Sequence, residues 1–125
     1  METVAIDEQA AIGCLVAAFP ETRAGHEDLR DTWTLAPNDL GIYIVFGDLF
    51  SVDIFWRLMT QDHLDADWLS RFFAVLEELC RDGNKLVREF VGDEVCEVLN
   101  AHPEWWRERV DAFIGPEMVI ECQES

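Results

Sequence analysis

The stretch GIYIVFGDLFSVDIFWRL, residues 41–58, is the densest apolar run in the chain and contains its single tyrosine. Residues 42–46 are β-branched and aromatic, which favours an extended segment. From Asp48 onward the apolar residues recur at helical spacing, which predicts a buried helix over residues 48–60 that the Asp48 carboxylate caps. We therefore expect an extended entry, a corner at Gly47 and a central helix around which the rest of the chain packs. The apolar residues that define this helix are Leu49, Val52, Phe55, Trp56 and Met59.

Outside this stretch, periodic apolar residues predict an all-α chain of five to six helices in a single domain, residues 1–125. Short connections make neighbouring helices antiparallel, and helix starts that recur about every 18 residues are typical of a stack of helical hairpins of the HEAT type. A helical bundle is the alternative arrangement. The Pro, Asn and Asp content of residues 34–41 predicts a loop, and Gly83 is expected just after a helix end. The other predicted helices cover residues 5–19, 21–33, 67–81, 85–99 and 103–114.

The last segment, residues 117–122, is compatible with two structures. It is long enough for a final helical turn or for a strand that pairs with residues 42–46. The sequence leaves both open, so a minor two-stranded β pairing of 42–46 with 117–122 remains an alternative addition to the all-α fold.

The net charge is the second feature that limits the function. The chain carries 9 basic and 26 acidic residues, a formal net charge of −17, while half of its 125 residues are hydrophobic. That apolar content argues against disorder, and the negative charge repels nucleic acid and anionic membranes but attracts basic surfaces. We therefore expect a basic protein partner, no direct binding of nucleic acid and no membrane binding. A surface that serves solubility alone is the alternative explanation of the charge.

The N-terminus and the cysteines indicate the compartment. The opening sequence METVAIDE is acidic where a signal peptide carries basic residues, and no apolar run reaches the length of a membrane span. These features predict a soluble, cytoplasmic protein. The four cysteines are far apart, with no CxxC motif, and each occupies an apolar position of a predicted helix. We therefore expect buried, reduced thiols at Cys14, Cys80, Cys96 and Cys122.

Signals for catalysis or metal binding are weak in this sequence. Residues 63–67, His-Leu-Asp-Ala-Asp, include types that bind metals, but they lack the glycine and the terminal glutamate of a calcium loop. Capping of the following helix accounts for Asp65 and Asp67 equally well. His26 has no nucleophile beside it, and no GxGxxG loop is present. We predict no enzymatic activity, no cofactor and no metal; a metal enzyme built on residues 63–67 is the opposing hypothesis.

Acidic residues form three groups of candidate partner-binding residues. In the first, Glu89, Asp93 and Glu97 recur at four-residue intervals, with Glu94 beside them. Like charges at this spacing destabilise a helix by about 0.2–0.5 kcal/mol per pair, whereas a field of one sign steers a charged partner. We therefore interpret this row as a binding surface. The two further groups are Asp62, Asp65 and Asp67, and Asp48 and Asp53.

The aromatic pair Trp105-Trp106 is a further candidate for binding. Adjacent helical residues point about 100° apart. If Trp106 faces inward with Val110 and Phe113, Trp105 is exposed among charged residues, where binding hot spots are often found. We therefore include Trp105 among the partner-binding residues, and the same exposed ring is compatible with a homodimer. The alternative is an aromatic residue at the edge of the core.

Four short segments carry a resemblance to a class of bacterial proteins. They are Phe19-Pro20-Glu21, Val45-Phe46-Gly47-Asp48, the helix from Phe72 to Leu79, and Gly115-Pro116-Glu117. In this pattern, and in its size and acidity, the chain resembles the small all-helical immunity proteins of polymorphic toxin systems, within an uncharacterised domain family. The resemblance covers most of the chain. It implies a binding role and no catalytic residues.

Charge and resemblance together lead to two hypotheses of function. The first is an immunity or antitoxin-type inhibitor of a basic toxin domain such as a nuclease, with carboxylates in the site that normally binds phosphate. The alternative is a DNA mimic or regulatory adaptor that binds a nucleic-acid-binding protein. A mimic needs carboxylates spaced like phosphates over a long surface, and it competes with nucleic acid for its partner.

Overall fold

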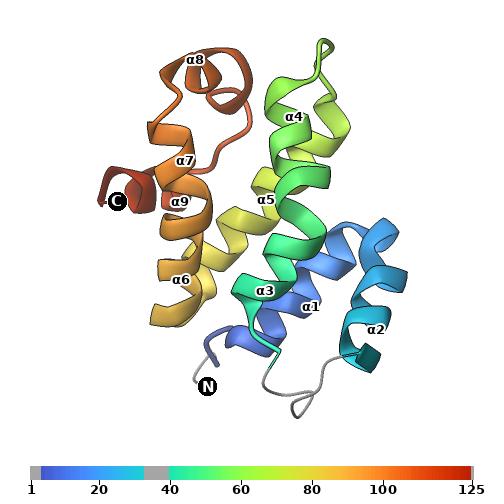
Figure 1. Ribbon diagram of the computed structural model, residues 1–125. Coiled ribbons are helices and arrows are strands. Elements are labelled where there is room, and N and C mark those ends of the chain that lie inside the picture. The colour runs from blue at the N-terminus through green and yellow to red at the C-terminus, as the bar shows by residue number, and fades with distance from the viewer. Residues whose placement is uncertain (1–3, 33–39, 125) are drawn as a thin grey trace.

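The computed structural model describes residues 4–32 and 40–124 (Figure 1). Those residues are mostly helical, which confirms the all-α prediction. Trp33 and most of the loop predicted over 34–41 lie outside the described residues. In the labels used here, α marks α-helices and η marks 3₁₀ or π segments. The elements are α1 (Glu8–Ala18), η1 (Pro20–Thr22), α2 (Arg23–Thr32), α3 (Ile42–Phe46), η3 (Gly47–Trp56), α4 (Arg57–Thr60), α5 (Ala66–Asp82), α6 (Lys85–Val91), η4 (Gly92–Cys96), α7 (Glu97–Asn100), α8 (Pro103–Trp105), η5 (Trp106–Val110) and α9 (Pro116–Glu124).

Two long helices each combine three of these elements. α3, η3 and α4 continue into one another and form the central helix, residues 42–60. In the same way, α6, η4 and α7 form the acidic helix, residues 85–100. The middle part of each is π-helical. The corner expected at Gly47 is wrong, because Gly47 keeps helical dihedral angles, φ −57° and ψ −43°.

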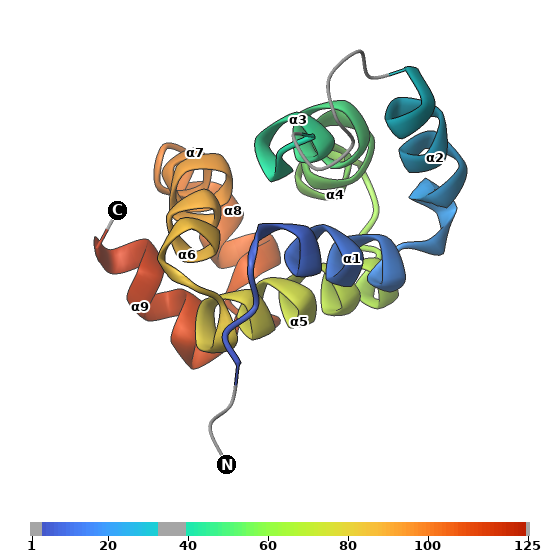
Figure 2. The same ribbon diagram turned by 90° about the horizontal axis from the view of Figure 1, so that it is seen from below.

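The helices pack in two layers. The central helix and the acidic helix lie side by side and run in the same direction in one layer, and α1 and α5 lie behind them (Figures 1 and 2). α9 packs against α5 and η4. The outer sides of the two long helices therefore face away from the second layer. Within the described residues, no helix is both long and apolar enough to span a membrane.

Aromatic rings of the central helix form the middle of the core. Phe46 stacks on Phe50 at a centroid distance of 6.0 Å and meets Phe90 of the acidic helix edge-on at 5.1 Å. Phe55 stacks on Phe72 of α5 at 5.5 Å. All five rings are almost completely buried. The central helix thus contacts both its neighbour and the second layer, as the sequence predicts for this stretch.

The extended segment expected over residues 42–46 is wrong, because these residues form the helix α3. Ile42, Val45 and Phe46 are buried at the spacing of a helix face. The Glu8 carboxylate of α1 accepts a hydrogen bond from the Ile42 amide at 3.1 Å and so satisfies a free amide at the helix start. Strand propensity is weak against such tertiary contacts, and here burial and a distant carboxylate decide the structure.

Two related predictions also fail. Asp48 is exposed inside the central helix rather than at its start, so it is not the N-cap. The pairing of 42–46 with 117–122 is wrong, because both segments are helical and the second belongs to α9. Among the described residues, the β-type contact is a single bridge between Ile6 and Gly83.

The π-helical middle of the central helix changes which residues are buried. In π turns the hydrogen bonds join residues five apart, and Val45, Phe50 and Phe55, at intervals of five, are all buried. The α-helical spacing assumed from the sequence placed Val52 and Trp56 inward. That prediction is wrong, since Val52 is 70% exposed and Trp56 is 37% exposed.

The prediction for α5 is confirmed. It spans Ala66–Asp82, close to the expected 67–81, and the Asp65 side chain accepts from the Trp68 amide at 3.1 Å. Gly83 follows the helix end, where a Cβ atom would collide with the Leu79 carbonyl oxygen. The local signals of cap, apolar face and glycine were therefore sufficient here.

The prediction of four reduced thiols is wrong for two residues. Cys96 of the acidic helix and Cys122 of α9 form a disulfide across a sequence separation of 26. Nearby, Asn100 Nδ2 donates to the Cys122 carbonyl oxygen at 2.9 Å. Cys14 and Cys80 are free thiols, half-buried and buried respectively. The pairing depends on α9 packing beside η4, which spacing along the chain does not reveal.

Candidate functional site

The acidic row lies on the exposed side of the acidic helix. Glu89, Asp93 and Glu97 are exposed, and Glu94 is half-buried. Among the described residues, the cation paired with this row is Lys85, whose Nζ lies 3.7 Å from Glu89 Oε1. Both side chains of that pair are largely exposed, so the pair contributes only about 0.3–0.5 kcal/mol. The row therefore keeps a large excess of negative charge.

Tyr43 of the central helix belongs to this surface, although nothing in its sequence context indicated so. Its hydroxyl donates a hydrogen bond to Asp93 Oδ2 at 2.9 Å, and its ring meets Phe90 edge-on at 5.5 Å. Burial, the bond to Asp93 and the negative charges of Asp93, Glu94 and Glu89 raise the pKa of Tyr43 to about 12. The hydroxyl therefore stays protonated, and the link between the two helices persists, at neutral pH.

Glu94 shows how closely the carboxylates of the row are spaced. Burial is the first cause that raises its pKa above the usual glutamate value, and the negative charges of Asp93 and Glu97 follow. A nearby cation favours the ionised form of such a carboxyl and offsets the repulsion. The row is therefore a place where a basic side chain is attracted.

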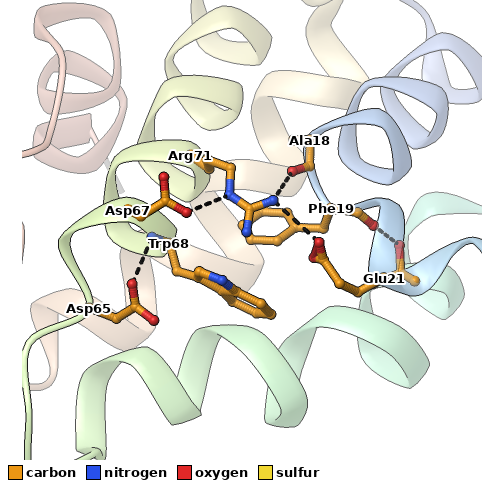
Figure 3. Close-up of polar contacts among 8 residues, drawn as sticks. Ala18, Phe19, Glu21, Asp65, Asp67, Trp68 and Arg71 are labelled. Carbon is orange, nitrogen blue, oxygen red and sulfur yellow. Dashed lines mark hydrogen bonds and ion pairs between the residues drawn. The ribbon is translucent and has the colours of Figure 1, made fainter.

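In the second predicted group, two of the three aspartates have roles inside the fold (Figure 3). Asp65 caps α5, and Asp67 Oδ2 lies 3.4 Å from Nε of Arg71. Asp62 is exposed in the turn between α4 and α5. The fold thus engages Asp65 and Asp67, although the Asp67 side chain stays 78% exposed, and Asp62 is exposed as well.

Arg71 holds the α1–α5 corner together rather than offering a site. Its guanidinium carbon lies 4.9 Å from the centre of the Phe19 ring and 5.1 Å from that of Trp68 (Figure 3). Its Nη1 donates to the Ala18 carbonyl oxygen at 3.0 Å and lies 3.4 Å from Glu21 Oε1. These contacts join the end of α1 to α5 through charge and ring stacking.

The third predicted group lies on the neighbouring helix of the same layer. Asp48 and Asp53 are both exposed on the central helix. The exposed side chains of Val52 and Trp56 belong to the same helix. The bond from Tyr43 to the acidic row connects the exposed sides of the two helices. Asp48, however, lines a groove of about 340 Å³ with residues of α2, so it lies on the side of the central helix that faces α2 and away from the acidic row.

The exposed position expected for Trp105 is wrong, because Trp105 is 7% exposed. Its ring stacks on His102 at 3.9 Å and meets Trp56 edge-on at 5.2 Å. The cause is the π segment η5: Trp105 and Val110, five apart, face the core together, and Trp106 is only partly buried. Trp105 is therefore an aromatic residue at the edge of the core, as the alternative prediction had it. Its neighbour Trp56, on the central helix, is the more exposed of the two rings.

The described residues contain no group of three or more His, Cys, Asp and Glu side chains placed to hold a metal. His63 and Asp65 line a pocket of about 170 Å³ together with Arg57, whose charge opposes a cation. Cys14 lines an open groove of about 510 Å³ between α1 and α5. Burial, and then the charge of Glu78, raise the pKa of Cys14, so its thiol is a poor nucleophile. What the geometry offers chemically is a surface of carboxylates that attracts cations.

One comparison with known proteins identifies the family of the chain. The family described as "Domain of unknown function (DUF7674)" matches residues 12–124. This range runs from α1 into the last turn of α9, and includes both long helices. The searches of curated proteins and of solved structures found no significant match. Because the match covers nearly the whole sequence, the chain belongs to the family Domain of unknown function (DUF7674).

Proposed function

We propose that the protein is a non-enzymatic inhibitor that binds a basic protein domain, as an immunity protein binds its toxin. The observation that supports this most strongly is the acidic row, with three exposed carboxylates at four-residue intervals. A single, largely exposed lysine pairs with the row among the described residues. The formal net charge of −17 shows that the excess of negative charge is not confined to this row.

The energetics of the row favour a basic partner. Glu89, Asp93 and Glu97 repel one another in the free protein, at a cost of about 0.2–0.5 kcal/mol for each pair four residues apart. Lys or Arg side chains of a partner replace that repulsion with attraction. Charges of opposite sign also raise the rate of encounter, an effect that salt screens. Binding should therefore be fast and sensitive to salt.

Inhibition follows if the partner uses its basic residues for catalysis or substrate binding. A nuclease binds phosphate groups with Lys and Arg side chains. Carboxylates of the row would pair with those side chains and so prevent phosphate groups from binding there. The row extends from Glu89 to Glu97, about two turns of helix, which is enough to contact several basic side chains at once.

A DNA mimic or regulatory adaptor that binds a nucleic-acid-binding protein is the second candidate. The exposed Asp48 and Asp53 favour it, because they extend the carboxylates from the acidic helix to the central helix. A mimic must compete with nucleic acid for its partner. An inhibitor of a toxin that has no affinity for nucleic acid shows no such competition, so a competition assay with DNA separates the two.

The test takes as the partner the protein encoded by the reading frame next to the gene of this chain, which is called the adjacent reading frame below. Growth of cells that express this product is scored with and without the chain, and binding is measured with the two purified proteins. The wild-type chain is expected to restore growth and to bind. A variant with a neutral row is expected to lose most of both activities. Its substitutions are Glu89→Gln, Asp93→Asn, Glu94→Gln and Glu97→Gln.

A charge-matched variant controls for the loss of net charge. It neutralises four exposed acids outside the row and is expected to protect cells as the wild type does. Equal protection by both variants would show that the row is not the binding site. An adjacent product that is neither toxic nor bound by the chain would contradict the inhibitor proposal. The control substitutions are Glu27→Gln, Asp31→Asn, Glu108→Gln and Asp111→Asn.

A further inference from the structure

The central helix keeps an apolar row on its exposed side. Ile44, Val52 and Trp56 are 36%, 70% and 37% exposed. Among the described helices, α1 and α5 lie behind the central helix, and α2 and the acidic helix lie to either side of it (Figure 2). None of them crosses the remaining side. Exposed apolar side chains that share one helix side and are edged by charge are typical of an interaction surface.

Both aromatic rings on this side are already held in place. Trp56 lies edge-on to Trp105 at 5.2 Å and to His102 at 5.8 Å. Tyr43 is fixed by its hydrogen bond to Asp93. Each of the two residues still keeps more than a third of its surface exposed. A ring that is fixed before binding loses little freedom on contact, so more of the contact energy becomes affinity.

Carboxylates border this apolar row and limit what can cover it. Asp48 and Asp53 are exposed on the same helix, and Asp93 contacts Tyr43 from the acidic helix. These three acids outnumber the one cation exposed on this helix, Arg57, which follows Trp56. A second copy of the chain would place an identical set of carboxylates against the first, which like-charge repulsion opposes. Lys and Arg side chains meet the same carboxylates favourably. The charge therefore selects a cationic partner over a second copy.

We propose that the central helix binds a cationic amphipathic helix of the partner. The apolar side of that helix covers Ile44, Val52 and Trp56, and its flanking Lys or Arg residues contact Asp48 and Asp53. An amphipathic helix that lays its apolar side on a partner is a recurrent mode of recognition. Tyr43 and Trp56 lie thirteen residues apart on the central helix, and a bound helix of about three to four turns covers that stretch.

This inference rests on the proposed function, because it names the part of the basic partner that the protein binds. The test uses three synthetic peptides of about 18 residues, or five helical turns. The first is built from Leu and Lys with all Leu on one helical side. The second has the same composition in scrambled order, and the third replaces every Lys of the first by Gln. Affinity is measured by fluorescence anisotropy of the labelled peptides.

The ordered basic peptide is expected to bind about tenfold more tightly than the scrambled one, a difference of about 1.4 kcal/mol. The neutral peptide is expected to bind most weakly. Val52→Ser and Ile44→Ser should remove the preference for the ordered peptide and leave the affinity for the scrambled peptide unchanged. Ile120→Ser removes a side chain that is 50% exposed on α9 and should change neither affinity.

The outcomes separate this inference from the proposed function. Equal binding of the two basic peptides, unchanged by Val52→Ser, overturns the inference and leaves the proposed function in place. Binding of neither basic peptide contradicts the attraction to basic partners and so counts against both. A dimer in sedimentation that Val52→Ser dissociates shows a second copy on this row, which also overturns the inference.

Discussion

The Tyr43 hydroxyl lies 2.9 Å from the Asp93 carboxylate and joins two helices across fifty residues of sequence. The bond lies on the exposed side of both helices, where Tyr43 precedes the apolar row and Asp93 stands in the middle of the acidic row. The two proposed binding surfaces are therefore connected through one hydrogen bond. This relationship can be measured directly, because the protein contains one tyrosine.

Titration of Tyr43 tests the bond. The phenolate absorbance should rise with a midpoint at a pKa of about 12, above the usual value of about 10. Asp93→Asn removes one of the charges that raise this pKa and should lower the midpoint. It should not restore the usual value, because burial is the largest cause. A wild-type midpoint at the usual value would contradict the described contact.

The same shift makes stability depend on pH in the alkaline range. The pKa of Tyr43 is higher in the folded state than in the unfolded state. Its contribution to the free energy of unfolding is therefore complete below about pH 10 and is lost as the pH rises through about 12. Denaturant unfolding of the wild type and of Tyr43→Phe over this range measures the effect. The phenylalanine variant cannot ionise there and should lack this step.

Glu94→Gln should raise the melting temperature at neutral pH. The pKa of Glu94 is raised by burial, then by Asp93 and Glu97, so the stabilising contribution of its protonated form is lost as the pH rises through that pKa. The gain from the substitution should therefore vanish near pH 4, where an unfolded glutamate is protonated (about pH 4.3). Glu27→Gln, at an exposed site on α2, is the control. A lower melting temperature for Glu94→Gln at neutral pH would show that burial and the neighbouring carboxylates do not destabilise ionised Glu94.

Glu77 of α5 caps the last helix from a distance. Its carboxylate accepts from the amides of Glu117 at 3.1 Å and Met118 at 2.9 Å, at the first turn of α9. Glu77→Ala should lower the free energy of unfolding by about 1 kcal/mol, as the loss of an N-cap does. Hydrogen exchange in α9 should also become faster. Glu78→Ala removes a neighbouring exposed carboxylate that caps nothing in α9, and should leave that exchange unchanged.

The disulfide between Cys96 and Cys122 fastens α9 to the acidic helix. Replacing both cysteines by alanine should lower the free energy of unfolding by about 3 kcal/mol, because the disulfide no longer restricts the conformations of the unfolded chain. α9 also carries Glu121, whose pKa is raised by burial and then by Glu124, with Glu89 of the acidic row contributing. Added salt screens this repulsion, so it should recover part of the lost stability.

Counting thiols in the unfolded, unreduced protein checks that prediction. Two free thiols are expected, those of Cys14 and Cys80. Four thiols would contradict the disulfide and would agree with the reducing cytoplasm that the sequence predicts. Cys14→Ser provides a matched control, because it removes a cysteine outside the pair and should lose much less stability than the double alanine variant.

Local signals were enough to predict some elements and not others. α5 could be predicted because its cap, Asp65, and its apolar face lie within the element itself. The start of the central helix could not, because the carboxylate that satisfies Ile42 comes from Glu8, 34 residues earlier. Strand propensity was then the strongest signal left in that segment, and it was wrong.

The candidate site was also predictable only in part. The acidic row follows from charge and helical spacing alone, since ionised side chains stay exposed. The positions of Trp105 and Val52 depend on π turns, and a fixed α-helical period assigned both to the wrong side. Tyr43 could not be placed from sequence, because its partner Asp93 is distant along the chain.

The acidic row is proposed to attract a basic partner. The most direct test of this attraction is the association rate constant with the purified product of the adjacent reading frame, measured by stopped flow over a range of salt. We predict a rate constant that falls by about 10- to 1000-fold from low to high salt. The dependence should be clearly weaker for the neutral-row variant than for the charge-matched control. A rate constant that does not change with salt, or equal salt dependence in the two variants, would contradict electrostatic attraction by the acidic row.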